Sequence, residues 1–221
     1  MKHTIIAASL LATSICFTPA AAVAQDSGFS LGLRAGYAVP FGEASGGTDL
    51  SDLATGAVPL QVDADYRVSR DWRLGIYFGY GPAFVADAAE RDLEAAGLTD
   101  VGGHRQQVLG VQVTRVFKSG ARFSPRVGLA GGYEWTRYAG AKRPSGMETE
   151  VGLSGFAGSV TLGGDYAVSP RFAVGPYVSV DLGRYRKELV WVEDADTSFT
   201  DIRDKALHGW VEAGVRLTWT F

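Results

Sequence analysis

The sequence predicts an all-β protein, an eight-stranded antiparallel up-and-down β-barrel that crosses a membrane with its strands. Three observations favour this fold. Hydrophobic residues make up 46% of the 221 residues, yet no apolar run long enough for a membrane helix follows the first 25 residues. Hydrophobic and polar residues instead alternate along eight segments, as they do on the two faces of a strand. The connections between these segments are short and long in turn.

The N-terminal segment has the features of a secretory signal peptide. Lys2 gives a basic start, residues 5–17 are apolar, and small residues follow. Ala22-Val23-Ala24 fits the A-x-A cleavage pattern, so we expect residues 1–24 to be a signal peptide and residues 25–221 to form the barrel. Ile15 occupies the position where a lipoprotein site has a small residue, which argues against a lipid anchor on Cys16. The mature chain would then contain no cysteine.

The C-terminal segment shows the alternation most clearly. Val215, Leu217 and Trp219 alternate with Arg216 and Thr218 in a stretch that extends over 13 residues, to the end of the chain. Soluble strands average about 5–6 residues, whereas tilted membrane strands need about 9–11. The expected strands are 29–39, 60–68, 72–80, 109–113, 126–135, 156–168, 172–182 and 209–221. Expected irregularities are Val108 and Val116 on the polar face, a bulge near Ser154-Gly155, and a gap in the ladder at Pro176.

The connections are expected to alternate in length around the barrel. Short turns are predicted at 69–71, 118–124 and 169–171, and long segments at 40–57, 82–104, 136–150 and 186–207. The long segments contain 16 acidic and 8 basic residues, so the loops at one end should be acidic and exposed. Residues 86–96 have the composition of a short helix within the second long segment.

The apolar face is expected to contact lipid, although alternation alone does not distinguish inside from outside. An exported chain, small residues on the polar face and aromatic residues at the strand ends all favour an apolar exterior. The aromatic residues expected at the membrane interface near the short turns are Tyr66, Trp72, Tyr166, Phe172, Trp219 and Phe221. The short turns would then face the periplasm.

The polar face would line a narrow lumen. The charged residues expected there are Arg34, Asp63, Asp65, Arg67, Arg73, Arg126, Glu134, Asp165, Asp181, Glu212 and Arg216. Because unpaired charges are costly to bury, we expect these groups to pair and to fill the interior of an eight-stranded barrel. A narrow ion or solute path is the alternative interpretation of the same residues.

Residues 26–221 resemble the small eight-stranded outer-membrane barrels, namely the OmpA membrane domain, OmpX, OmpW and the opacity-type proteins. The most specific likeness is the final alternating strand ending in Trp219-Thr220-Phe221. The resemblance implies an outer-membrane location, contact with outer-membrane lipid and lipopolysaccharide, and recognition of Phe221 as an assembly signal by the outer-membrane assembly machinery. The peptidoglycan-binding domain that follows the barrel in OmpA-type proteins is not expected here.

The expected function is a non-enzymatic structural or surface-interaction role, with acidic loops exposed. The alternative is a narrow pore or small hydrophobic-solute channel of the OmpW type. A lipid A-modifying enzyme is the less favoured alternative. The resemblance to lipid A deacylases of this shape would require a His-x-Ser motif. His208 precedes Gly209-Trp210 and His104 precedes Arg105-Gln106, so the serine is absent. We expect no catalytic residue, and both histidines are expected to be solvated at the barrel rim.

The sequence predicts no cofactor and no metal site. Asp194-Ala195-Asp196 begins like a calcium loop, but Phe199 and Lys205 stand where an EF-hand has Gly and Glu. A formal net charge of −3 gives no basic footprint for nucleic acid. The sequence identifies no extracellular ligand.

Overall fold

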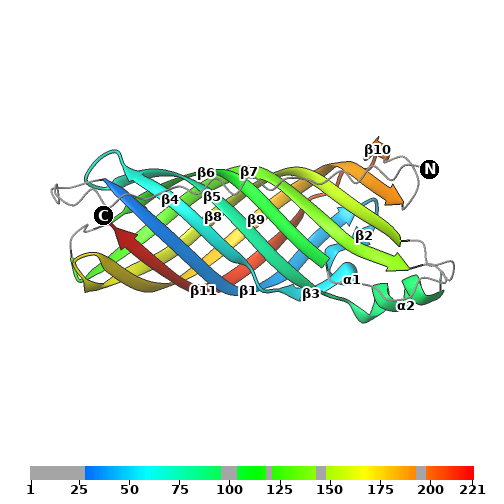
Figure 1. Cartoon of the computed structure of the whole chain (residues 1–221), viewed down its shortest axis with the longest axis horizontal. Coiled ribbons are helices and arrows are strands. Elements are labelled where there is room, and N and C mark those ends of the chain that lie inside the picture. Colours follow the sequence, from blue (N-terminus) through cyan, green and yellow to red (C-terminus); the bar gives the residue numbers. More distant parts are fainter. Residues whose placement is uncertain (1–27, 96–103, 118–120, 143–147, 193–197) are drawn as a thin grey trace, which may run out of the picture.

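The computed structural model describes residues 28–95, 104–117, 121–142, 148–192 and 198–221. The expected signal peptide, residues 1–24, and the segment Asp194-Ala195-Asp196 lie outside the described residues. Eight antiparallel strands form a ring that closes where the last strand pairs with the first, which confirms the predicted fold (Figure 1). These strands are β1 (Phe29–Ser45), β4 (Leu60–Arg67), β5 (Trp72–Val85), β6 (His104–Val116), β7 (Phe123–Lys142), β8 (Glu148–Ser169), β9 (Phe172–Val192) and β11 (His208–Thr220).

The alternating pattern determines which side chains face outward. Ile76 is 61% exposed on the outer face, whereas Asp63, on the polar parity of the neighbouring strand β4, is 1% exposed. Large apolar side chains cover the exterior of every strand in the ring, and buried polar side chains face the interior. Since a closed sheet also pairs its own backbone groups, this barrel satisfies the two requirements of a lipid environment.

Strands at one end of the barrel run well beyond their predicted limits. β7, β8 and β9 contain 20, 22 and 21 residues, about twice the length that crosses a bilayer. The prediction that 136–150 and 186–207 are connections throughout was therefore wrong. In these extensions the backbone hydrogen bonds continue without the apolar alternation that marks the membrane part. The short strand β10 (Ser198–Asp201) pairs with this extension of β9.

Two helices lie at the same end as these extensions, opposite the C-terminus (Figure 1). Between β1 and β4 the chain forms β2 (Thr48–Asp49), α1 (Leu50–Leu53) and β3 (Ala54–Ala57), and β3 pairs with β1 and β5 above β4. The helix predicted within 86–96 is present as α2 (Asp87–Ala95). Neither described helix has the length and hydropathy needed to cross a membrane. We call this end the loop end and the opposite one the turn end.

The predicted irregularities have specific structural causes. The register shifts at Ser154/Gly155 as predicted, but the extra residue is Arg186 of β9, because Ser154 pairs with Lys187 and Gly155 with Tyr185. Near Pro176 the β8–β9 ladder is interrupted between Gly163↔Tyr177 and Tyr166↔Val174, since proline has no N–H to donate. At the end of β6, Val116 is buried while the guanidinium of Arg115 lies outside, 5.6 Å from the Trp72 ring centre.

Candidate functional site

The centre of the lumen holds a carboxylate between two guanidinium groups. Arg34 of β1 lies directly opposite Arg216 of β11, and Asp63 of β4 reaches between them. Arg34 Nε lies 3.4 Å from Asp63 Oδ1, and Arg216 Nη2 donates a hydrogen bond of 2.5 Å to Asp63 Oδ2. All three side chains are buried and shielded from water, so their charges are compensated by one another and not by solvation.

Neutral side chains extend this group across the lumen. Arg34 donates to Gln112 Oε1 at 2.9 Å, and Gln112 Nε2 donates to Asp65 Oδ1 at 2.7 Å. Arg216 also donates to Asp65 at 3.0 Å. We call Arg34, Asp63, Asp65, Gln112 and Arg216 the central cluster. The sequence prediction omitted Gln112, although its position on the polar parity of β6 was the available signal.

The central cluster fits only because glycines stand beside it. A Cβ on Gly32 would lie 2.3 Å from Asp63 Oδ2, and one on Gly75 would lie 2.1 Å from Asp65 Oδ1. Such distances are far below van der Waals contact. These two glycines therefore provide the space in which the aspartates meet the arginines.

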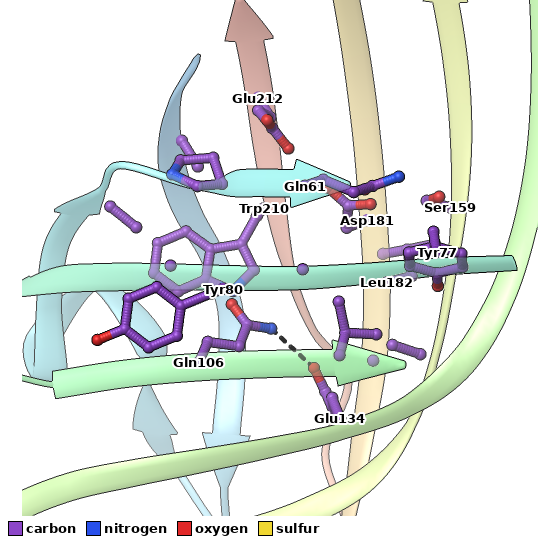
Figure 2. Close-up of a pocket in the computed structure, with 18 of the residues that line it drawn as sticks. Gln61, Tyr77, Tyr80, Gln106, Glu134, Ser159, Asp181, Leu182, Trp210 and Glu212 are labelled. Carbon is purple, nitrogen blue, oxygen red and sulfur yellow. Dashed lines mark hydrogen bonds between the residues drawn. The ribbon is translucent and has the colours of Figure 1, made fainter. Parts of the chain in front are cut away.

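The loop-end half of the lumen contains a small cavity of about 80 Å³, lined by both apolar and polar side chains (Figure 2). Glu134 lies on its wall, where Glu134 Oε1 is 2.7 Å from His208 Nε2 and Gln106 donates to Glu134 Oε2 at 2.9 Å. Asp181 and Glu212 also line the cavity and accept hydrogen bonds from Ser179 and Tyr177. The lining therefore carries three carboxylates, one of which, Glu134, contacts His208.

The two histidines are not solvated, which corrects the prediction. His104 is 2% and His208 is 1% exposed, because each begins its strand on the inward-facing parity. The His208 ring stacks on Tyr185 with ring centres 3.8 Å apart and planes 14° apart. Tyr185 in turn is hydrogen bonded to Thr136 at 2.9 Å. These contacts fix the imidazole against the barrel wall.

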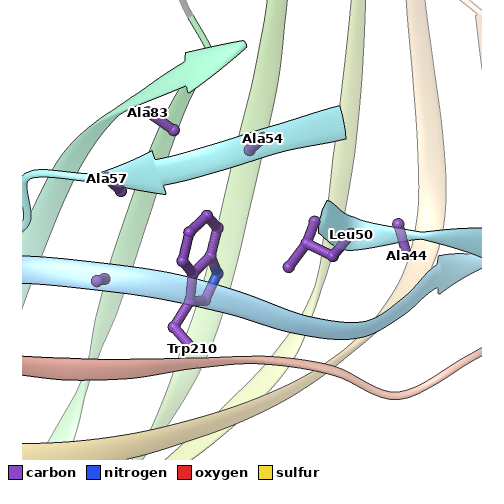
Figure 3. Packing of buried hydrophobic residues seen from close by; sticks show 7 residues of the cluster. Ala44, Leu50, Ala54, Ala57, Ala83 and Trp210 are labelled. Carbon is purple, nitrogen blue, oxygen red and sulfur yellow. The ribbon is translucent and has the colours of Figure 1, made fainter. Parts of the chain in front are cut away.

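An apolar cluster covers the loop end of the lumen. Leu50 of α1 is fully buried, and it gathers with Ala54, Ala57 and Trp210, which is 4% exposed (Figure 3). Because Trp210 is an inward-facing residue of β11, the α1–β3 segment must fold over the opening to bury it. We call Leu50, Ala54, Ala57 and Trp210 the apolar cap.

The turn-end half of the lumen is rich in arginine. Arg126 Nη1 lies 3.6 Å from Asp165 Oδ1. Arg67 and Arg73 are directly opposite one another on β4 and β5 and line a pocket of about 220 Å³. Within the described part of the chain neither of these two arginines forms an ion pair or a side-chain hydrogen bond. The lumen is thus acidic toward the loop end and basic toward the turn end.

The predicted interface aromatics lie on the exterior at the turn end. Exposed members are Tyr66, Trp72, Tyr166, Trp219 and Phe221, whereas Phe172 is half-buried. The rings of Phe172 and Trp219 are 4.6 Å apart, and those of Phe29 and Phe221 are 5.8 Å apart. Rings in this position suit the boundary between hydrocarbon and headgroups.

No protein-family model and no curated protein matches the sequence. Among solved structures, the chain is similar to the neisserial surface protein A, with a TM-score of 0.52 and 14% identity over 86% of this chain and 96% of that one. It is also similar to the outer membrane protein OprG from Pseudomonas aeruginosa, with a TM-score of 0.51 and 14% identity over 88% of this chain and 98% of that one. At such identity the likeness concerns the fold.

The closed ring, the apolar exterior and these similarities define the fold. The chain has the fold of the small eight-stranded outer-membrane β-barrels, with an exterior suited to lipid. Its described residues contain no group of three or more metal-ligating side chains that could hold an ion.

Proposed function

We propose that the protein is a non-enzymatic outer-membrane barrel with a closed lumen, which acts through its outward loops in envelope structure or surface interaction. The observation that carries this proposal is the central cluster, which joins β1, β4, β6 and β11 across the lumen. The loop-end cavity of about 80 Å³ has room for only a few water molecules, and the apolar cap lies beyond it.

The exposed loops support a surface role. Asp87, Glu90, Asp92 and Glu94 of α2 are all exposed at the loop end, which agrees with acidic loops. The long extensions of β7, β8 and β9 raise this surface well above the apolar belt. A rigid, acidic and membrane-anchored surface is suited to contact with external partners.

The competing proposal is a narrow pore or hydrophobic-solute channel of the OmpW type. A conducting path needs continuous water along the lumen, and a hydrophobic-solute path needs an apolar lining; the central cluster opposes both. The test is planar-bilayer recording from the purified, detergent-folded protein at high salt. We expect no reproducible unitary conductance. Conductance steps of constant size, whose number increases with protein concentration, would establish the pore instead.

An enzyme remains the third candidate because His208 and Glu134 are in contact, as are the base and the orienting acid of a hydrolase triad. Among the described residues, His208 contacts Glu134 and stacks on Tyr185, and neither supplies a serine or cysteine nucleophile. Mass spectrometry of lipid A after overexpression tests this point. We expect an unchanged lipid A profile, whereas a modification that disappears in His208→Ala or His104→Ala would establish the enzyme.

The proposed partners are outer-membrane lipid, lipopolysaccharide at the loop end, and the assembly machinery at the C-terminal strand. The last proposal rests on Phe221, whose ring is exposed and whose N–H donates to Phe29 O at 3.1 Å as the ring closes. We expect Phe221→Ala to slow insertion into vesicles that contain the assembly machinery, with little effect in vesicles without it. Equal slowing in both would assign Phe221 to the intrinsic folding of the barrel.

A further inference from the structure

Two pairs of directly opposed arginines face the lumen, and they differ in how their charge is balanced. Arg34 and Arg216 are cross-strand neighbours, and Asp63 lies between them within 3.4 Å of each. Arg67 and Arg73 are likewise cross-strand neighbours on β4 and β5. Like charges directly opposite are destabilising in a sheet. The second pair has no carboxylate in ion-pair contact among the residues that the structure describes.

The pocket that Arg67 and Arg73 line has the properties of an anion site. Its volume is about 220 Å³, and it lies at the turn end of the lumen. Arg171 adds a third guanidinium to the lining, and Ser169, Thr218 and Thr220 are further lining residues, each with a hydroxyl group. Asp165, its one acidic lining residue, lies 3.6 Å from Arg126 and also has a favourable Coulombic interaction with Arg73.

We infer that this turn-end pocket binds a small phosphate-type oxyanion. The anion would bridge Arg67 and Arg73 as Asp63 bridges Arg34 and Arg216. The lining contains three arginines and one aspartate, and this excess of positive charge matches a dianion better than a single carboxylate. Planar guanidinium groups also bind the oxygens of phosphate in pairs. Because Arg67 and Arg73 face the lumen, the ligand is a soluble anion such as inorganic phosphate or a small phosphomonoester, and not a lipid headgroup.

The experiment titrates inorganic phosphate into the full barrel in zwitterionic micelles while NMR follows the arginine Nε–Hε signals. Sodium chloride at equal ionic strength controls for screening. We expect a saturable shift at Arg67 and Arg73 with phosphate alone, and affinity at least about tenfold weaker in Arg67→Gln and in Arg73→Gln. Arg67→Lys, which keeps the charge but loses the paired donors, is expected to weaken binding less than Arg67→Gln.

Arg122→Gln is the matched control, because Arg122 lies at the same end but outside the lumen, 5.0 Å from the Tyr166 ring centre. It should leave phosphate affinity unchanged, and heat-dependent gel mobility checks that every variant is folded. Equal affinity in the wild type and both glutamine variants, or a response that chloride reproduces, would overturn the proposal. A second titration uses short-chain phosphatidic acid. Stronger shifts at Arg73 than inorganic phosphate produces would identify a lipid headgroup as the occupant and also overturn it.

Discussion

The charged residues of the lumen are compatible with burial only as a connected group. Asp63 contacts both Arg34 and Arg216, so the loss of this one carboxylate leaves two guanidinium groups facing each other without compensation. Leaving one partner of a buried pair uncompensated is far more costly than removing the pair together.

Asp63→Asn is therefore expected to lower the free energy of unfolding by about 3–5 kcal/mol. Urea titration in lipid vesicles, followed by tryptophan fluorescence, measures this change. Asp92→Asn on the exposed face of α2 is the control, and its effect should stay within about 0.5 kcal/mol. A double variant Arg34→Gln/Asp63→Asn should be destabilised by less than the sum of its single variants. Additive effects would show that Arg34 and Asp63 are energetically independent.

Gly75 is a second residue on which the central cluster depends. Its added Cβ would lie 2.1 Å from Asp65 Oδ1 and 2.6 Å from Ala64 O, and the latter is backbone that has little freedom to move. We expect Gly75→Ala to destabilise the barrel by about 1–3 kcal/mol in the same urea titration. Gly131→Ala is the matched control, because its nearest neighbour lies 4.0 Å away. Similar losses in both variants would indicate a general intolerance of alanine in these strands.

At the scale of elements, each strand meets different requirements along its length. Within the bilayer a strand must place apolar residues outside, whereas above it the backbone ladder alone maintains the strand. The α1–β3 segment departs from this scheme, because α1 leaves the ladder and buries Leu50 before β3 rejoins the wall between β1 and β5. The apolar cap is thus built from Leu50 of α1, Ala54 and Ala57 of β3, and Trp210 of β11.

Leu50→Ala is expected to release the α1–β3 segment from the barrel, since removal of a fully buried leucine costs about 2–5 kcal/mol. Limited proteolysis in micelles should then cleave within residues 46–57 faster than in the wild type, while the rest of the barrel stays resistant. Val58→Ala is the control, because Val58 is 37% exposed and lies next to the same segment. An unchanged cleavage rate in Leu50→Ala would mean that other contacts hold the segment.

At the scale of the whole molecule, the central cluster and the apolar cap together divide the lumen into separate compartments. The loop-end cavity carries Glu134, Asp181 and Glu212, and the turn-end pocket carries Arg67 and Arg73. The near balance of charge along the lumen, evident from composition, is therefore an average over two regions of opposite sign.

If the central cluster closes the barrel, its removal should open a path. We expect the triple variant Arg34→Ala/Asp63→Ala/Arg216→Ala, combined with replacement of residues 46–53 by a Gly/Ser linker, to show unitary conductance in planar bilayers. The linker variant alone should remain silent. Heat-dependent gel mobility confirms that each variant is folded. Silence of the combined variant would place the barrier elsewhere in the lumen.

The sequence determined the fold, which side chains face outward and which side chains line the lumen. Alternation is a local property, because successive side chains of a strand point to opposite faces, so Arg34, Asp63 and Arg216 could be assigned to the interior without coordinates. The helix within 86–96 and the shift at Ser154/Gly155 were local signals of the same kind.

Only the tertiary structure decided which charges meet, how far the strands extend and what covers the lumen. Arg216 and Asp63 are 153 positions apart in the chain, and their contact depends on the relative stagger of the strands around the closed ring. No single segment encodes that stagger. For the same reason only the assembled barrel showed the burial of His104 and His208 and the bridge through Gln112. It also showed that, among the described residues, no carboxylate bridges Arg67 and Arg73.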